Sequence, residues 1–487
     1  MSTKDYLKGI LLLVYLSSNA VLCVIYPFYI VIALNLLVIF TVLFSIKPAW
    51  GVYLLIFLVP ISRDSLYFVF TGEWNFKVSD AYINLLPVFT PVFLFTCVGF
   101  LLHKGASLWQ SDDKSTVNLL LISIAVYAAF TLFWTENIQH SMFQYYYLVT
   151  NIMLLVIIVS AVTTDQTHRM IMWAVVFSCL FEAVMSYYFR FIDTSIFEHE
   201  FFESIAIGGR NYGGLLSVDG SPVQAHGLQE AHETSMLMNI FMGVSAGLFL
   251  TESGLKKRIF LVCCFILGLS VLIGTESRAG AASFILMGMF FLFFHNKTSR
   301  YFVTSAAIFL SALLVFYVVQ QKIFSVLAGK EDTIMRLLML GEKAVDTGDV
   351  LDPGLTVKEG AGPGRRTIWG VGFTGLTGKW PFGVGIGNYK YFSRSPHAHS
   401  VPFSFLFDFG LIGLSLFLSI VFVTAKSYIK LIRSQQTYIQ IMSLCIMSTL
   451  MAIVFQGCFD FDYTYPLFWL FGGILFSTLR LGSKGGK

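Results

Sequence analysis

The chain has 487 residues, of which 56% are hydrophobic and only 12% are charged, and its mean hydropathy is +0.74. Ordinary soluble domains carry roughly a quarter charged residues, so this composition excludes a soluble globular protein and predicts a protein of the bilayer. The formal charge of +4 is too small to indicate nucleic-acid binding. The seven cysteines lie within or at the end of apolar segments, which predicts neither a disulfide framework nor a metal site.

Apolar segments long enough to cross a membrane recur along nearly the whole chain. Crossing a hydrocarbon core of about 30 Å takes roughly 20 helical residues, so hydropathy predicts an all-α, polytopic transmembrane bundle of about 12–14 spans. Lys4 and Lys8 precede the first apolar stretch, and no small-residue cleavage pattern follows it, so we expect an uncleaved first span. The predicted spans are 9–25, 28–46, 49–62, 82–102, 116–134, 146–163, 169–189, 233–251, 258–274, 280–295, 301–320, 401–423, 438–457 and 464–480.

Positive charge sets the expected orientation. With the N-terminus in the cytoplasm, the cytoplasmic connections and their flanks hold seventeen lysines and arginines, whereas the short outer connections hold five. The positive-inside rule describes this asymmetry. It places three segments on the outer face of an inner-membrane protein: residues 190–232, the turn from Gly274 to Gly280, and residues 321–400, which form a long loop between two late spans.

Two arginines on this outer face are candidate functional residues. Arg278 lies in GTESRAG at the boundary of two spans, where an arginine either snorkels to lipid phosphates or serves a functional site. Its small neighbours, among them Ser277, favour the close approach of a ligand. Arg210 lies in the glycine-dense GGRNYGG, where it is either solvated or close to a ligand.

The long loop 321–400 carries two further pairs of candidates. It is too long for a turn and too poor in apolar periodicity for its own core, so we expect short helices and ordered loops that cap the bundle. Arg365 and Arg366, in GPGRRTIWG, are either a solvated pair or a substrate-binding pair. His397 and His399, in PHAHS, have no partner at metal-ligand spacing, which favours acid–base use over metal binding.

Other residues raise the possibility of a metal but do not support it. His226 and His232 lie on the same outer face, yet AHGLQEAHE lacks the HExxH order of a metalloprotease helix. Asp460 and Asp462, in GCFDFDYTYP, form a DxD pair that can hold a divalent cation, although two interfacial aspartates more often solubilise a loop. We therefore predict no metal and no cofactor.

The segment that begins at His399 matches a known spacing. His399-Ser400, nine residues (VPFSFLFDF) and Gly410-Leu411-Ile412-Gly413 resemble a pattern found in bacterial O-antigen ligases. That pattern is His, then Asn, Ser or Gln, nine residues, and Gly-x-x-(Gly, Thr or Tyr). In the O-antigen ligase and polymerase superfamily this histidine ends a large periplasmic loop just before a late span, as it does in this chain.

Two arginine-containing turns extend the resemblance over residues 205–480. In the superfamily, an arginine in a Thr-x-Ser-Arg-Gly-like turn precedes the large loop by two spans. The ESRAG turn around Arg278 resembles this turn with Ala279 in place of the glycine, and GGRNYGG around Arg210 resembles an earlier outer loop. Ala282 stands at the leucine position of an Arg-x-x-x-Leu pattern described for ligases, which weakens the choice of ligase over its relatives.

The resemblance implies a metal-independent, inverting glycosyltransferase. It would move a glycan from a polyprenyl (undecaprenyl) diphosphate carrier to an acceptor hydroxyl on the periplasmic face of a bacterial inner membrane. Arg278 and Arg210 would stabilise the diphosphate that leaves, and His399 would take the proton of the acceptor. The other residues expected to bind substrate are Ser277, Arg365, Arg366 and His397.

The resemblance also divides the chain into three parts. Residues 1–190 are expected to be N-terminal transmembrane helices, residues 191–480 the catalytic membrane region with loop 321–400, and residues 481–487 a cytoplasmic tail. The expected partners are the lipid-linked glycan donor, a glycan or lipid A–core acceptor, and membrane lipids, without nucleic acid.

Several functions remain open at this point. The acceptor is another lipid-linked repeat in a polymerase, lipid A–core in a ligase, or a protein hydroxyl in a protein O-oligosaccharyltransferase. The long loop lacks an obvious protein-binding module, which favours polymerase or ligase. From a different class, a polysaccharide transporter or flippase also has twelve to fourteen helices with intramembrane charge. The scarcity of ionisable residues in mid-span and the long outer loop favour transfer over transport.

Overall fold

The structure is a computed structural model of the full chain. Two predicted spans, 9–25 and 301–320, and all but one residue of the span 28–46 lie outside the described residues. The described residues are 47–58, 75–78, 81–84, 116–191, 231–275, 277–295, 365–389, 398–432, 437–459 and 463–484, with single positions 43, 93, 96, 97 and 100.

Helices make up most of the described chain. Those of the N-terminal half are α3 (Pro48–Leu58), α5 (Thr116–Thr131) with the 3-10 turn η2 (Leu132–Trp134), α6 (Ile138–Ala161) and α7 (Asp165–Phe191). Those of the C-terminal half are α9 (Ala231–Thr251), α10 (Leu255–Gly274), α11 (Arg278–His295), α14 (Arg365–Gly375), α16 (Val401–Ile432), α17 (Thr437–Gly457) and α18 (Pro466–Lys484).

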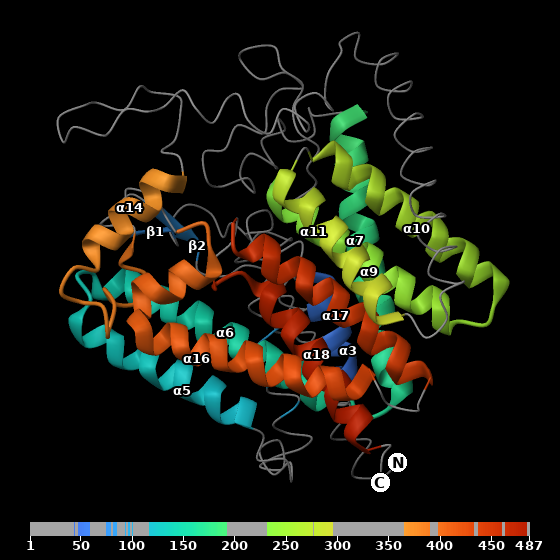
Figure 1. Ribbon diagram of the computed structural model, residues 1–487, viewed down its shortest axis with the longest axis horizontal. Helices are drawn as coiled ribbons and strands as arrows, with labels where there is room; N and C mark the ends of the chain where they lie inside the picture. The colour runs from blue at the N-terminus through green and yellow to red at the C-terminus, as the bar shows by residue number, and fades with distance from the viewer. Residues whose placement is uncertain are drawn as a thin grey trace, which may run out of the picture.

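Helices α9 and α17 form the centre of the bundle. Helix α9 packs against α7, α10, α11 and α17, and α17 packs also against α16 and α18. On one side, α16 pairs with α5 and α18 pairs with α6, while α7, α10 and α11 gather on the other side (Figure 1). The two central helices therefore connect the two sides.

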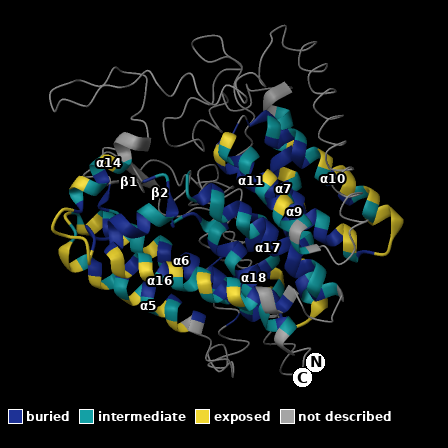
Figure 2. Cartoon of the chain, viewed as in Figure 1, coloured by how far each residue is buried: buried dark blue, intermediate teal, exposed yellow. Residues whose placement is uncertain are grey.

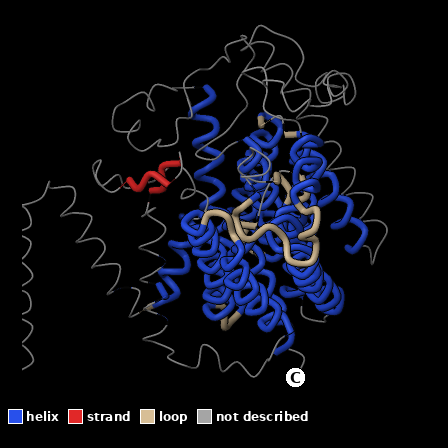
Figure 3. Tube along the Cα trace, turned by 90° about the vertical axis from the view of Figure 1, so that its left-hand side faces the viewer, coloured by secondary structure: helices blue, strands red, loops and turns tan. Residues whose placement is uncertain are grey.

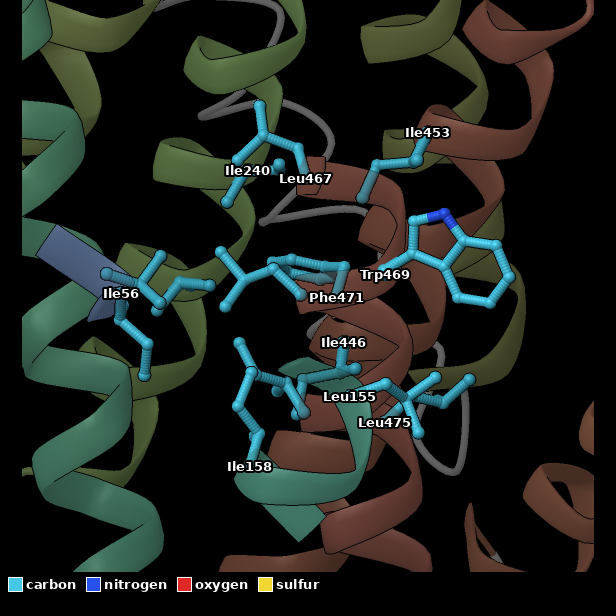
Figure 4. Close-up of a cluster of buried hydrophobic side chains, with 14 of the residues drawn as sticks. Ile56, Leu155, Ile158, Ile240, Ile446, Ile453, Leu467, Trp469, Phe471 and Leu475 are labelled. Atoms are coloured by element: carbon cyan, nitrogen blue, oxygen red, sulfur yellow. The ribbon is translucent and has the colours of Figure 1, made fainter. Parts of the chain in front are cut away.

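Apolar side chains from distant parts of the chain form the core. Ile56 of α3, Ile158 of α6, Ile240 of α9, Ile446 of α17 and Phe471 of α18 belong to one buried cluster (Figure 4). Buried residues concentrate around α17 and α18, whereas α5, α10 and α14 show many exposed positions (Figure 2).

Small residues let the central pair approach closely. Gly243 and Gly247 on α9 face α17, where a Cβ on Gly243 would collide with the Thr449 hydroxyl and one on Gly247 would lie 3.1 Å from Cys445 Cβ. Packing through small residues at this spacing is typical of transmembrane helices, whose association has no hydrophobic driving force in lipid. The α9–α17 contact therefore suits a membrane bundle.

The outer surfaces of the helices are also apolar, as a lipid environment requires. On α10, Ile259, Val262 and Ile266 are exposed at helical spacing, while Leu261 and Leu269 are buried. A helix that is apolar on all sides belongs in a large core or a membrane. Six described helices are long and apolar enough to cross a bilayer: Ile138–Ala161, Asp165–Tyr188, Ala231–Thr251, Leu255–Gly274, Val401–Tyr428 and Tyr438–Gly457.

The predicted all-α fold of a membrane protein is confirmed, with one small exception among the described residues. The strands β1 (Asn75–Val78) and β2 (Ala81–Asn84) form an antiparallel hairpin outside the bundle (Figure 3). The predicted span 82–102 is therefore wrong at its start, because residues 81–84 pair as a strand. Helix α16 continues to Ile432, so the first part of the predicted connection 424–437 is helical.

The helix ends meet in two groups. The beginnings of α7 and α17 and the ends of α9 and α18 lie together at what we call the inner end, where His168 bonds Tyr438 (3.0 Å) and Thr478 (2.8 Å). The beginnings of α9, α11 and α16 and the end of α17 lie together at the outer end. This grouping is the one that alternating membrane crossings require.

Candidate functional site

Arg278 is exposed at the outer end, where it is the first residue of α11. Ser277 caps this helix by accepting a hydrogen bond from the Gly280 amide at 3.0 Å, and Thr275 Oγ1 accepts from the Ser277 amide at 3.3 Å. Asn239 of α9 donates to the Gly280 carbonyl at 3.0 Å. Arg278 makes no salt bridge within the part of the chain that the structure describes.

The first turn of α9 lies beside the Ser277 turn. His232 Nδ1 is 3.4 Å from Ser277 Oγ. Gln456, near the end of α17, donates its Nε2 to the His232 carbonyl at 2.9 Å and to Ser235 Oγ at 2.7 Å. The end of α17 therefore ties down the beginning of α9, which in turn contacts the turn that carries Arg278.

His399 lies at the same outer end, two residues before α16. Its backbone φ of +49° falls in the left-handed region that non-glycine residues rarely occupy. Gly457, the residue after Gln456, approaches the first residue of α16, so that a Cβ on it would lie 3.4 Å from Val401 Cγ2. The last turn of α17 thus contacts the beginnings of both α9 and α16, and it brings the predicted histidine and arginine to one end of the bundle.

The outer end carries charged groups of both signs. Helices α9, α11 and α16 all begin there, and the unpaired amides of a helix start act as roughly half a positive charge. The exposed guanidinium of Arg278, at the start of α11, suits a phosphate group, whereas the first turn of α9 carries the buried carboxylate of Glu233. Among the described residues, no three or more His, Cys, Asp or Glu side chains gather as possible metal ligands.

Helix α16 is broken at Gly410, where φ is +65° and ψ is −162°. Residues 380–388, which we call the wedge segment, fill the break. The Leu411 amide donates to the Trp380 carbonyl at 2.9 Å, and the Asp408 carbonyl accepts from the Gly385 amide at 3.0 Å. Backbone N–H and C=O groups at such a break must be paired when they are buried, and the wedge segment pairs them.

The glycines of the Gly410-Leu411-Ile412-Gly413 motif have a structural reason. A Cβ on Gly410 would lie 2.5 Å from the Gly383 amide nitrogen, and a Cβ on Gly383 would lie 2.5 Å from the Gly410 nitrogen. Both residues also have positive φ. Gly413 passes against Phe409, with which a Cβ would collide. The motif therefore encodes the break and the close approach of the wedge segment.

Helices α5 and α6 hold the wedge segment from its other side. The Ile386 amide donates to Thr131 Oγ1 at 3.1 Å, and Ser141 Oγ donates to the Ile386 carbonyl at 2.6 Å. Asn388 Oδ1 accepts from Thr135 at 3.3 Å. The wedge segment is thus fixed between the α5–α6 connection and the broken helix.

Asp408 is a buried carboxylate that sequence reasoning missed. Its Oδ2 accepts hydrogen bonds from the Gly387 amide at 3.0 Å and from the Tyr463 hydroxyl at 2.5 Å. The Tyr463 carbonyl accepts from Trp469 of α18 at 2.6 Å. A carboxylate within a candidate membrane span is a functional candidate by default. The signal in the sequence was a lone aspartate in an apolar run, two residues before Gly410.

The other predicted residues are placed only in part. Arg365 and Arg366 begin helix α14, so they do not lie in irregular loop, and α14 confirms the expectation of short helices in the long loop. Helix α14 packs against α16. The remaining candidates, Arg210, His226, His397, Asp460 and Asp462, lie outside the described residues.

Comparison with known families identifies the region around this site. Residues 263–418 match the family model described as O-antigen ligase, which is about a third of the chain. The matched region runs from α10 into α16 and includes the Arg278 turn, the wedge segment and His399. The resemblance to the O-antigen ligase and polymerase superfamily is thereby confirmed. A search of curated proteins finds no match.

Proposed function

We propose that this protein transfers a glycan from an undecaprenyl diphosphate carrier to an acceptor hydroxyl at the periplasmic face of a bacterial inner membrane. The family match supports glycan transfer of the O-antigen ligase or polymerase type. The observation that carries the proposal is that Arg278 and His399 lie at one end of the bundle, joined through the last turn of α17.

The donor diphosphate is proposed to bind at Arg278, at the start of α11. It gains negative charge as it leaves the sugar, and preformed donors aimed at that charge lower the barrier. The guanidinium of Arg278 offers two parallel N–H groups to phosphate oxygens, which a lysine cannot. Arg210, on the same predicted face, is proposed as the second arginine. In this mechanism two arginines do what a metal ion does in other transferases.

The acceptor is proposed to lose its proton to His399. The acceptor oxygen attacks the anomeric carbon on the face opposite the diphosphate, and the carbon–oxygen bond to the diphosphate breaks as the new bond forms. The proton passes to the imidazole, and the lipid diphosphate leaves as an anion. Imidazole suits this task because its ordinary pKa, near 6.5, lies close to neutral pH. The anomeric configuration is inverted.

Four more residues are proposed to bind substrate. The Ser277 hydroxyl lies next to Arg278 and beside His232, so it is close to the proposed diphosphate position. Arg365 and Arg366 begin α14, which packs against α16 near the His399 end. His397 precedes His399 by two residues.

The proposed acceptor is a glycan or lipid A–core, which makes the protein a polymerase or ligase of surface polysaccharide. A protein hydroxyl is the alternative, in which case the protein is an O-oligosaccharyltransferase. Gel profiles of surface polysaccharide from a deletion strain separate the first two. Single-repeat products indicate a polymerase, and long lipid-linked chains without attachment indicate a ligase.

The inner end supports transfer over transport. Glu252, after α9, pairs with Arg169 of α7 at 3.0 Å and with Lys257 of α10 at 3.2 Å. The Arg169 guanidinium lies 4.6 Å from the ring centre of Tyr438 on α17. These contacts tie four helices together at the end opposite the candidate site. A transporter has to open at both ends, whereas a transferase needs access from only one.

The test is transfer by purified protein with the native lipid-linked glycan as donor. His399→Ala is expected to lower the rate by about two to four orders of magnitude, the usual share of general acid–base catalysis, and to leave donor binding nearly intact. Arg278→Lys keeps the charge but loses the paired N–H groups, so it is expected to weaken both turnover and binding of undecaprenyl diphosphate.

The comparison variant is His397→Ala, which should cost less than His399→Ala, because the spacing to Gly410 selects His399 alone. Near-normal transfer by His399→Ala together with loss of transfer in His397→Ala would show that the motif register is wrong. Near-normal transfer by both variants would reject the mechanism. Loss of activity with a chelator, restored by magnesium or manganese, would reject the metal-independent account.

A further inference from the structure

We propose that Trp369 is a positioning residue for His399. This inference rests on the proposed role of His399 as the base. Trp369 lies on α14, one turn after Arg365 and Arg366, and its indole Nε1 donates a hydrogen bond to the Ala398 carbonyl at 2.8 Å. The bond joins α14 directly to the residue that precedes His399.

The Ala398 carbonyl is a sensitive place for such a bond. It belongs to the peptide unit that links Ala398 to His399. The indole hydrogen bond therefore fixes the orientation of the peptide plane that precedes His399. His399 then turns into the left-handed region, with φ of +49°. A non-glycine residue holds this conformation only where its surroundings impose it, and such residues cluster at functional sites. Ala398 is buried, so its carbonyl is sheltered from competing water.

Aromatic contacts make α14 and the beginning of α16 one packed unit. The Trp369 ring lies 4.7 Å from the Phe403 ring, measured between centroids. Phe373, one turn further along α14, lies 5.6 Å from Phe403 and 5.4 Å from Phe407. Ring pairs at these separations add to the burial of apolar surface. They hold the indole in position to make its hydrogen bond.

The hydrogen bond and the packing can be separated. Packing alone needs only an aromatic ring, and phenylalanine would supply one. Tryptophan adds one polar group, the indole N–H, and this N–H donates its hydrogen bond to the peptide unit before His399. If Trp369 served only to attach α14, its N–H would make no difference to transfer. If it orients His399, loss of the N–H lowers the rate while the fold and donor binding stay the same.

The test is a double-mutant cycle of Trp369→Phe and His399→Ala, with transfer rate, binding of undecaprenyl diphosphate and thermal unfolding measured on each protein. Trp369→Phe is expected to lower the transfer rate about ten- to a hundredfold, the cost of a small misplacement of a catalytic group. Binding of undecaprenyl diphosphate should not change. In the His399→Ala background the same change should cost nothing further, because residues that act through one another are not additive.

Trp380→Phe is the matched control. The Trp380 ring stacks on Phe373 with centroids 6.0 Å apart and is 39% exposed, and only its backbone carbonyl takes part in the α16 break. This variant should transfer at the wild-type rate. A second probe of Trp369 is its replacement by the benzothienyl analogue of tryptophan, in which sulfur takes the place of the N–H and the ring shape is kept. The analogue should lower the transfer rate as Trp369→Phe does. It provides the test if the phenylalanine variant folds poorly.

The outcomes are distinct. Wild-type transfer with the benzothienyl analogue would overturn the inference, as would losses that multiply in the double variant. Near-normal transfer by His399→Ala alone would instead reject the proposed function, and this result is visible in the single variant before the cycle is read. A loss in Trp369→Phe that disappears in the His399→Ala background supports both proposals together.

Discussion

Polar residues are arranged differently at the two ends of the bundle. At the inner end, Glu252 is 5% exposed and receives hydrogen bonds from Arg169, Lys257 and Trp173. His168 is enclosed between two hydroxyl groups. Charges and polar groups are thus paired with one another, and these pairs hold the helices together.

At the outer end, the same kinds of residue are arranged for access. Arg278 is exposed and has no ion pair among the described residues, and His399 is half-buried in a left-handed conformation. Helix α16 is interrupted at Gly410, nine residues after its start. Strain and unneutralised positive charge cost stability, and proteins keep them where binding or catalysis uses them. The inner end therefore stabilises the bundle, while the outer end carries the proposed site.

The largest expected difference between the two ends is in labelling by a membrane-impermeant thiol reagent. We expect all-or-none labelling, at one end of the bundle and not at the other. Thr377→Cys, exposed at the outer end, should be labelled in whole cells, and Ser253→Cys, exposed at the inner end, should not. Both changes are made after the seven native cysteines are replaced by alanine. Labelling of Ser253→Cys alone would place the candidate site in the cytoplasm.

A second prediction concerns the break in α16. Gly410→Ala puts a Cβ 2.5 Å from backbone atoms of Gly383 and Pro381, at a φ that alanine rarely adopts. Strain of this kind costs about 1–3 kcal/mol, and the displaced wedge segment adds to it, so little folded protein is expected. Size-exclusion chromatography and thermal unfolding in detergent measure the loss.

The control for this prediction is Gly370→Ala on α14. A Cβ there meets nothing within 4 Å, and the residue is exposed in a helix. Alanine is the better helix former by about 1 kcal/mol, so this variant should be as stable as the wild type or slightly more so. A Gly410→Ala protein that folds and transfers normally would show that the break does not depend on glycine.

The third prediction tests the carboxylate of Asp408, which bonds the wedge segment. Tyr463→Phe removes a hydroxyl that donates to Asp408 Oδ2 at 2.5 Å, and a hydrogen bond to a charged group contributes about 1.5–3 kcal/mol. Tyr127→Phe is the control, because its hydroxyl donates to the neutral Phe382 carbonyl at 3.2 Å near the surface. Unfolding in detergent should show a clearly smaller loss for the control. Equal losses would mean that Asp408 is not held as a charged group.

The smallest effect is expected at the inner end, where Glu252→Gln removes the charge that Arg169 and Lys257 share. The two basic side chains are 35% and 59% exposed, so solvent screens the pairs and the loss at neutral pH should be about 1 kcal/mol. Burial raises the pKa of the Glu252 carboxyl, but hydrogen bonds from Arg169, Lys257 and Trp173 outweigh it and leave the pKa below its ordinary value.

A lowered pKa fixes the direction of the pH effect. The carboxylate form stabilises the folded protein, so its contribution is complete at neutral pH and is lost as pH falls below about 4.5 and through the folded-state pKa. The stability difference between wild type and Glu252→Gln should therefore shrink in acid. A difference that grows as the pH falls would contradict the assignment. Transfer at neutral pH should change little, which separates this end from the outer one.

The parts of the fold that the sequence predicted are those with local causes. The spans 258–274, 280–295 and 438–457 correspond to α10, α11 and α17 almost residue for residue, because apolar length alone decides a membrane helix. The prediction was wrong where hydrogen bonds between two short strands, and not apolar length, determine the structure. Residues 81–84 belong to a hairpin, and nothing in their hydropathy separates a strand from the start of a span.

The sequence predicted individual residues of the candidate site but not the contacts that hold the site together. Arg278 and His399 were found from motif spacing, which a linear sequence preserves. The filling of the α16 break was not predictable, because Gly410 in an apolar run reads as helix, and the partner segment lies some 25 residues earlier in the chain. Trp369 was missed for the same reason, since an indole in a loop carries no sign of the carbonyl that it will meet.

The filled break in α16 also has a consequence for synthesis at the ribosome. Four backbone groups beside Gly410 bond to the wedge segment: the carbonyls of Phe407 and Asp408 and the amides of Leu411 and Ile412. Helix α16 therefore cannot take its final shape alone. The wedge segment precedes α16 in the chain, and Thr131 and Ser141, which hold it, precede both. Every partner of the break has therefore emerged before Gly410 does. Because synthesis runs from the N-terminus to the C-terminus, the wedge segment is made before α16. Helix α16 can therefore fold against partners that are already present.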